Sequence, residues 1–273
     1  MKVTFIGGGN MAQAIIGGLL RKGFERASIT VVEPFDDTRA RVSGQFGVRA
    51  VASAGELAEP ADLVVMAVKP QQMREAALAL APKLAGELVL SIAAGTRLAD
   101  LGRWLGGHAL LARCMPNTPA LIGEGVTGLY VMPGVAGDKR QLAIRVLEAV
   151  GEVVEVREEA LLDPVTAISG SGPAYVFYFI EAMQQAAAEL GLTPEQARML
   201  SIRTFTGAAR LAENSTEDAA SLRARVTSKG GTTERALAQM AEDRVKESIV
   251  RALKAANARA IEMGEQLGRD PAA

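Results

Sequence analysis

A glycine-rich segment near the N-terminus has the residue types and spacing of a site for dinucleotide phosphates. Gly7, Gly9 and Ala12 follow the strand-like residues 2–6 and precede a helical pattern. In a dinucleotide fingerprint, the first small residue permits a tight turn, the second lets the backbone approach a pyrophosphate, and the third permits close packing of helix and sheet. Free N–H groups at the start of the helix then face the phosphates. This pattern predicts a nucleotide site, although glycines also form ordinary turns.

Glu33 ends the next apolar run and bears on the choice of nucleotide. An acidic group at this position can accept hydrogen bonds from the adenosine ribose hydroxyls, which favours NAD over a cofactor with a 2′-phosphate. A solvated carboxylate at a strand end explains the residue nearly as well. Arg39 and Arg41 follow closely and can pair with a 2′-phosphate. The sequence therefore leaves the choice between NADH and NADPH open.

Three more segments with small residues or prolines follow apolar runs. In open α/β sheets, ligands bind outside the carboxyl ends of the strands, near the point where the strand order reverses. Segments at these ends can line the path of a cofactor, although each is also compatible with an ordinary loop. The segments are Val68-Lys69-Pro70, Ser91-Ile92-Ala93-Ala94-Gly95 and Cys114-Met115-Pro116-Asn117-Thr118-Pro119.

Two glycine-containing segments stand out in the second half of the chain. Residues 169–175 place two glycines and Pro173 in a helical context, which indicates close packing, a ligand or a kink between helices. Residues 228–234 form a glycine-rich turn that leads into a helix. Its free N–H groups can hold a substrate carboxylate, or the segment is only a well-capped helix start.

The scarcity of acid–base residues limits the chemistry. His108 is the one histidine, and residues 160–228 contain neither histidine nor lysine. Hydride transfer to or from an alcohol needs a group that handles the hydroxyl proton, commonly histidine or lysine. A cyclic imine can arrive protonated and accept hydride directly at its carbon, with a hydroxyl to orient the nitrogen. The composition of this half therefore favours reduction of a C=N bond.

The elements that must position these residues change character along the chain. Short β-rich runs alternate with helical patterns up to about residue 160, which predicts a doubly wound, mostly parallel α/β domain of Rossmann type. Residues 161–273 are predicted to form an all-helical domain. The expected strands are residues 2–6, 28–33, 63–68, 88–93, 109–115, 127–132 and 153–156; the expected helices include residues 11–21, 37–45, 70–84, 97–105, 138–150, 218–227, 232–241 and 243–267.

Helix boundaries in the second half are marked by capping residues. Asp163 before Pro164 is predicted to be an N-cap, and Thr193 before Pro194 is predicted to form a capping box with Gln196. Gly191 is expected to end the helix that precedes Thr193.

The overall composition is that of a soluble globular protein. The 273 residues include 30 basic and 31 acidic side chains, so no strong field is available for nucleic acid or an anionic membrane. A single cysteine excludes an intrachain disulfide. We expect a cytoplasmic protein without signal peptide, membrane span or metal site.

Taken together, the motifs resemble pyrroline-5-carboxylate reductase, and they occur in order over nearly the whole chain. The resemblance implies reduction of pyrroline-5-carboxylate, a small imino acid, to L-proline by NADPH or NADH. It also implies a homodimer with interlocked helical domains, with larger rings of dimers in the family. The motifs that carry the resemblance are Phe5-Ile6-Gly7-Gly8-Gly9-Asn10-Met11-Ala12, Ala67-Val68-Lys69-Pro70, Ser91-Ile92-Ala93-Ala94-Gly95, Met115-Pro116-Asn117-Thr118-Pro119, and residues 169–175 and 227–233.

By that resemblance, Thr233 bonds to the ring nitrogen and is the catalytic residue. Glu33 stands where many members carry a small hydroxyl residue that contacts a 2′-phosphate, and Lys229 replaces a common proline. The fingerprint and the resemblance together assign the substrate carboxylate to Gly230, Gly231, Thr232 and Thr233, and the dinucleotide to Gly7, Gly8, Gly9, Asn10, Met11, Glu33, Val68, Lys69, Pro70, Ala94, Pro116 and Asn117.

Other functions remain compatible with the sequence alone. One is a reductase of another cyclic imine or a related hydroxyacid dehydrogenase. Another is a non-catalytic protein that senses NAD(P), since motifs alone do not establish an activity.

Overall fold

The structure of the chain, a computed structural model, describes residues 1–269. Residues 1–171, together with those from Ala256 onward, form one compact unit, and residues 172–255 form a second.

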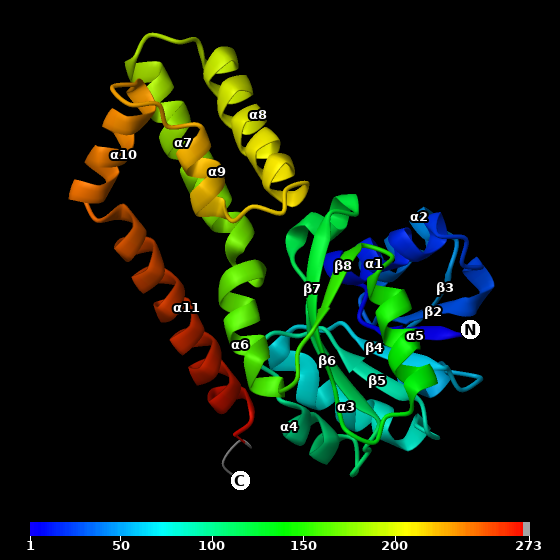
Figure 1. The fold of residues 1–273 in the computed structure, drawn as a ribbon. Helices are drawn as coiled ribbons and strands as arrows, with labels where there is room; N and C mark the ends of the chain where they lie inside the picture. The colour runs from blue at the N-terminus through cyan, green and yellow to red at the C-terminus, as the bar shows by residue number, and fades with distance from the viewer. Residues whose placement is uncertain (270–273) are drawn as a thin grey trace. The chain divides into compact units, whose positions relative to one another are not determined.

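The first unit is built on an eight-stranded sheet with the order β3-β2-β1-β4-β5-β6-β7-β8 (Figure 1). Neighbouring strands are parallel except for the antiparallel pair β6 and β7. The strand order reverses between β1 and β4, which confirms the predicted doubly wound arrangement. The strands are β1 (Val3–Ile6), β2 (Ile29–Val32), β3 (Arg49–Val51), β4 (Leu63–Met66), β5 (Leu88–Ser91), β6 (Leu111–Met115), β7 (Gly125–Val131) and β8 (Gly151–Glu155).

Helices cover both faces of this sheet. Along β1, Phe5 belongs to the apolar core on one face and Ile6 to the core on the other, as expected for strands buried on both sides. Each large side chain buried in this way stabilises the fold by roughly 1.5–3 kcal/mol, so the sheet is a firm support for its loops. Helices α1 (Asn10–Arg21), α2 (Asp36–Phe46) and α5 (Gly137–Leu147) pack on the first face, and α3 (Met73–Leu80) and α4 (Leu98–Trp104) on the second.

Two elements of the first unit differ from the sequence prediction. The pattern does not predict β3, a three-residue edge strand whose first residue, Arg49, is exposed. The helix expected over residues 70–84 is divided into the 3₁₀ turn Pro70–Gln72, α3 and the 3₁₀ turn Ala81–Lys83. Pro82 lies in the last turn and has no N–H to continue the helix.

The second unit is helical throughout. Its helices are α7 (Gly172–Glu189), α8 (Pro194–Glu213), α9 (Ala219–Arg225), α10 (Thr232–Glu242) and the first part of α11 (Val245–Leu267), whose residues from Ala256 belong to the first unit (Figure 1). Within it, the rings of Phe179 on α7 and Phe205 on α8 lie 6.4 Å apart between centroids. These helices agree with the all-helical character predicted for the second half of the chain.

The capping prediction is confirmed at Thr193 and wrong at Asp163. The Thr193 hydroxyl accepts a hydrogen bond from the Gln196 N–H at 3.3 Å, and the Gln196 amide oxygen accepts one from the Thr193 N–H at 2.9 Å. Gly191, with φ of 92°, follows α7 and ends it as expected. Asp163 instead lies inside the short helix α6 (Leu162–Val165), with its side chain buried. It pairs with arginines rather than with the helix backbone.

The glycines of residues 169–175 mark a change of helix type. A π-helical turn (Thr166–Gly170) separates α6 from α7. A Cβ atom added at Gly170 would lie 2.6 Å from the Met115 Cε atom, so the glycine permits close packing against the end of β6.

No helix among residues 1–269 is long and apolar enough to cross a membrane. In the same range, no group of three or more histidine, cysteine or acidic side chains is arranged to hold a metal ion.

Candidate functional site

The residues predicted to bind the cofactor lie at the carboxyl edge of the parallel strands. Backbone hydrogen bonds hold the loops of this edge together, from the Gly7 N–H to the Val32 oxygen and from the Ala67 N–H to the Ile6 oxygen, both at 2.8 Å. The loops that follow β1, β2, β4, β5 and β6 place at this edge Gly7, Gly8, Gly9, Asn10, Met11, Glu33, Val68, Lys69, Pro70, Ala94, Pro116 and Asn117.

The glycine loop after β1 is shaped as the fingerprint requires. Gly7 has a φ of 102°, and an added Cβ atom would lie 2.7 Å from the Ala67 carbonyl oxygen, so only glycine fits there. A Cβ atom at Gly9 would meet nothing within 4 Å. Gly9 is the N-cap of α1 and offers no side chain to its free N–H groups. This open, uncapped helix start fits the phosphates of a dinucleotide.

Glu33 holds this loop directly. Its carboxylate accepts hydrogen bonds from the Gly8 N–H at 2.8 Å and from the Phe35 N–H at 3.1 Å. The residue is only 6% exposed. Of the two interpretations of Glu33, a solvated carboxylate is therefore wrong: the side chain is buried and bonded to the residue between Gly7 and Gly9.

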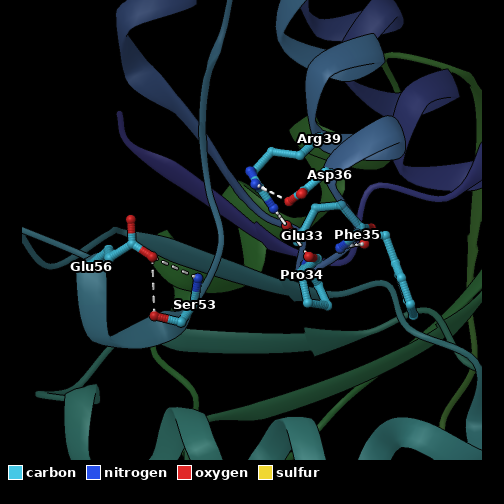
Figure 2. Close-up of polar contacts among 7 residues, drawn as sticks. All are labelled: Glu33, Pro34, Phe35, Asp36, Arg39, Ser53 and Glu56. Atoms are coloured by element: carbon cyan, nitrogen blue, oxygen red, sulfur yellow. Dashed lines mark hydrogen bonds and ion pairs between the residues drawn. The ribbon is translucent and has the colours of Figure 1, made fainter.

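Arg39 bonds to the backbone beside Glu33. Its Nη1 atom donates to the Glu33 and Pro34 carbonyl oxygens at 2.9 and 3.1 Å, and its Nη2 atom pairs with the Asp36 carboxylate (Figure 2). Arg41, by contrast, is exposed, and no hydrogen bond or ion pair within residues 1–269 engages its side chain.

The remaining edge residues differ in exposure. Lys69 is exposed at the N-cap of the turn that begins at Pro70, and Ala94 is half-buried. Asn117 is 8% exposed, and its amide oxygen accepts a hydrogen bond from the Val126 N–H at 2.9 Å. Asn117 thus fixes the loop after β6 to the start of β7, a role that the sequence does not reveal.

Sequence reasoning also missed a buried ionic cluster on β6. The Arg113 side chain is 3% exposed and lies 3.1 Å from Glu159 and 3.6 Å from Asp163. Arg97 lies 3.6 Å from the other oxygen of Asp163, and Glu159 also accepts a hydrogen bond from the Leu98 N–H at 2.8 Å. The cluster joins β6, the start of α4 and the segment before α7. An arginine inside the apolar run 111–115 is the one sequence signal for it.

Neither His108 nor Cys114 presents a free reactive group. The His108 ring is half-buried, with its Nε2 atom 2.8 Å from the Glu87 carbonyl oxygen. Cys114 is buried in β6, and burial raises the pKa of its thiol against the opposing charge of Arg113. Reaction through a thiolate is therefore disfavoured.

The predicted substrate residues lie in the second unit, in a β-turn before α10. The Gly231 N–H donates to the Ser228 carbonyl oxygen at 3.1 Å, and Gly230 has a φ of 74°. Gly231 is the N-cap of α10 and supplies no capping side chain. Thr233 is half-buried, and its hydroxyl has no hydrogen-bond partner within the described chain. This second uncapped helix start offers N–H groups and one hydroxyl to an anionic ligand.

Two charged residues flank this turn. The Glu234 carboxylate accepts a hydrogen bond from the Gly230 N–H at 2.6 Å, which holds the turn in shape. Lys229, which precedes Gly230, is exposed.

Comparison with known proteins gives two family matches along the chain. Residues 159–263 match the family described as pyrroline-5-carboxylate reductase dimerisation. Residues 2–95 match the family described as NADP oxidoreductase, coenzyme F420-dependent. The two matches correspond to the helical region and to the part of the sheet that carries the glycine loop.

Full-length relatives agree with these matches. The chain is 44% identical over 269 residues to pyrroline-5-carboxylate reductase of Pseudomonas aeruginosa, covering 98% of both chains. The structure of a pyrroline-5-carboxylate reductase from Coxiella burnetii matches with a TM-score of 0.91 and 39% identity, over 96% of this chain and 98% of that one. Plasmodium falciparum pyrroline carboxylate reductase, solved with NADP bound, matches with a TM-score of 0.85 and 28% identity over 97% and 98%. The chain therefore belongs to the pyrroline-5-carboxylate reductase family.

Proposed function

We propose that this chain reduces the C=N bond of 1-pyrroline-5-carboxylate to L-proline with NADH or NADPH, the last step of proline biosynthesis. The observation that carries the proposal is that α1 and α10 each start at a glycine N-cap without a capping side chain, the first suited to a dinucleotide and the second to a small carboxylate. The near-full-length identity to pyrroline-5-carboxylate reductases supports the same reaction.

The residues of the first unit serve to hold the dinucleotide, which supplies the hydride when bound. The N–H groups at the start of α1 face its phosphates, with Gly8, Asn10 and Met11 nearest. Val68, Lys69, Pro70 and Ala94 line its path, and the loop at Pro116 and Asn117 faces the nicotinamide. The bond from Asn117 to Val126 keeps that loop in one position.

The glycine turn serves to hold the substrate. The N–H groups of Gly231, Thr232 and Thr233 hold the carboxylate, and Gly230 gives the turn its shape. The Thr233 hydroxyl bonds to the ring nitrogen. No side chain has to remove a proton from carbon or oxygen, so the rate enhancement comes mainly from proximity and orientation.

The helical region, residues 161–273, also serves as the dimer interface in this proposal. The match to a family of dimerisation domains supports it. So do large apolar side chains that are exposed in the single chain, among them Phe177 and Tyr178 on α7 and Met199 and Leu211 on α8, at 66%, 72%, 66% and 70%. Such a surface is typical of a protein–protein contact. Interlocked helical domains, a ring of dimers and a cytoplasmic location are part of the same proposal.

The reaction is tested by its product. Purified protein, pyrroline-5-carboxylate and each reduced cofactor are incubated, and L-proline is separated from D-proline and quantified. L-Proline formed in step with cofactor oxidation supports the proposal. Faster turnover of another cyclic imino acid or of a 2-hydroxy acid in a parallel panel would contradict it, as would cofactor binding without turnover of any of them.

A further inference from the structure

We infer that this chain prefers NADH to NADPH, because residues 33–39 place a fixed carboxylate at the adenosine ribose and keep their arginine engaged. The inference rests on the proposed binding of a dinucleotide at the carboxyl edge of the sheet. It goes beyond the family match, because the description of the family that matches residues 2–95 names NADP.

The Glu33 carboxylate cannot turn away from the site. It is buried, and each of its oxygens accepts a backbone N–H, one from Gly8 in the glycine loop and one from Phe35. In a dinucleotide fold the adenosine ribose lies beside the acid at this position and donates its hydroxyl hydrogens to it. A 2′-phosphate would instead bring a charge of about −2 against a carboxylate that has no room to withdraw.

Arg39 does not offset this charge. Its Nη1 atom binds two carbonyl oxygens of the segment after β2 and its Nη2 atom pairs with the Asp36 carboxylate, so both ends of its fork are engaged (Figure 2). A phosphate is bound best by a guanidinium whose fork is free for two parallel hydrogen bonds. Asp36 therefore acts as a positioning residue that keeps Arg39 away from a 2′-phosphate.

The loop after β3 adds no phosphate-binding group. Ser53 follows β3, the neighbour of β2, and both its N–H and its hydroxyl lie within 3.2 Å of the Glu56 carboxylate (Figure 2). The Ser53 hydroxyl, which could have donated to a phosphate, is thus hydrogen-bonded to the Glu56 carboxylate. Arg41 is the remaining cation nearby on α2, and a substitution of it is part of the test.

The test measures binding separately from turnover. Isothermal titration calorimetry of the full-length protein with NADH and NADPH gives two dissociation constants for each variant. We expect at least tenfold tighter binding of NADH to the unaltered protein, a difference of about 1.4 kcal/mol. Glu33→Ser should reduce that ratio at least tenfold. Glu33→Gln, which keeps the shape and an acceptor for Gly8, should reduce it in the same direction if Glu33→Ser fails to fold.

Variants of α2 distinguish the specific effect of Asp36 on Arg39 from the effect of removing any one negative charge from this turn. Asp36→Asn frees Arg39 and should tighten NADPH binding several-fold with little change for NADH. Asp37→Asn is the matched control, because Asp37 is an exposed acid in the same turn and no ion pair engages it in the described chain. The control should leave the ratio within twofold of its original value, as should Arg41→Ala.

Several results would overturn the inference. They are equal or tighter binding of NADPH to the unaltered protein, an unchanged ratio in both Glu33 variants, or no binding of either cofactor to folded protein. Tighter binding of NADH without turnover of pyrroline-5-carboxylate would support the inference and contradict the proposed reaction. The failures of the two proposals are therefore distinguishable.

Discussion

Thr233 is the residue on which the chemistry depends most directly. Its backbone N–H belongs to the uncapped start of α10, and its hydroxyl is free of partners in the described chain, so both can turn to a ligand. The residue is also half-buried, which limits competition from water. In the proposed mechanism the N–H binds the carboxylate and the hydroxyl orients the nitrogen.

Thr233→Ala should lower kcat for pyrroline-5-carboxylate by about 10- to 100-fold, because a hydrogen bond to a charged group contributes roughly 1.5–3 kcal/mol. Thr233→Ser keeps the hydroxyl and should retain most of the activity. Steady-state kinetics, with circular dichroism to verify folding, check both variants. Equal kcat values for Thr233→Ala and the unaltered protein would remove the hydroxyl from the mechanism.

The Arg113 cluster shows how a single residue can join elements distant in sequence. Replacing Arg113 with leucine leaves the Asp163 carboxylate buried with Arg97, 3.6 Å from its other oxygen, as the remaining cation. Breaking a buried ion pair in this way should lower the free energy of unfolding by about 3–5 kcal/mol. Urea denaturation at neutral pH measures the change.

Arg140→Leu is the control for that substitution, because Arg140 pairs with Glu155 at the surface, where both side chains are partly exposed. Its denaturation midpoint should remain close to that of the unaltered protein. Equal midpoints for the two variants would show that the buried Arg113 ion pairs stabilise the fold no more than the surface pair of Arg140.

The role of a residue can be predicted from the sequence where the local backbone geometry restricts which amino acid can occupy the position. Gly7 is recognisable because its positive φ and its close approach to the Ala67 carbonyl oxygen both require glycine. The structural contacts of Asn117 and Asp163 are not recognisable in this way, since their partners are distant in sequence and depend on how the chain folds. The Asp163-Pro164 pair even carries a local capping signal that the tertiary ion pairs override.

At the scale of elements, long regular patterns predict the structure best. The strands that form the middle of the sheet and helices α1 and α10 begin and end within one or two residues of the prediction, and α8 begins directly after the predicted N-cap Thr193. The edge strand β3 was missed because three residues with one buried side chain give no usable periodicity. Its carboxyl end nevertheless matters, since the Glu33 N–H donates to the Val51 oxygen at 2.9 Å.

The capping box at the start of α8 provides a test at this scale. Thr193→Ala removes one acceptor from the helix N-terminus and should destabilise the protein by about 1 kcal/mol. Thr206→Ala is the matched control on the same helix, because its hydroxyl only bonds back to the Ile202 carbonyl oxygen. Thermal unfolding at one protein concentration compares the two. A larger loss in Thr206→Ala would contradict the capping assignment.

At the scale of the whole molecule, a single chain leaves a large apolar surface of the second unit uncovered. Exposed phenylalanine, tyrosine, leucine and methionine side chains on α7 and α8 could not be recognised from periodicity alone, since helical patterns do not say which face meets a partner. The family of residues 159–263 indicates that a second copy is the partner.

Analytical ultracentrifugation should show a particle of twice 28.6 kDa or a multiple of that dimer. Met199→Glu places a charge on the apolar surface of α8 and should shift the population toward monomer. Leu78→Glu, at an exposed leucine on α3 of the first unit, should leave assembly unchanged. A monomeric unaltered protein, or equal effects of the two variants, would contradict the proposed interface.

Reduction of pyrroline-5-carboxylate is tested most directly by steady-state oxidation of NADH and NADPH, measured side by side with this substrate. We expect saturable, substrate-dependent oxidation of at least one cofactor, with L-proline as product and NADH the more efficient donor. No substrate-dependent oxidation of either cofactor, in protein shown to be folded and dimeric, would contradict the assigned reaction.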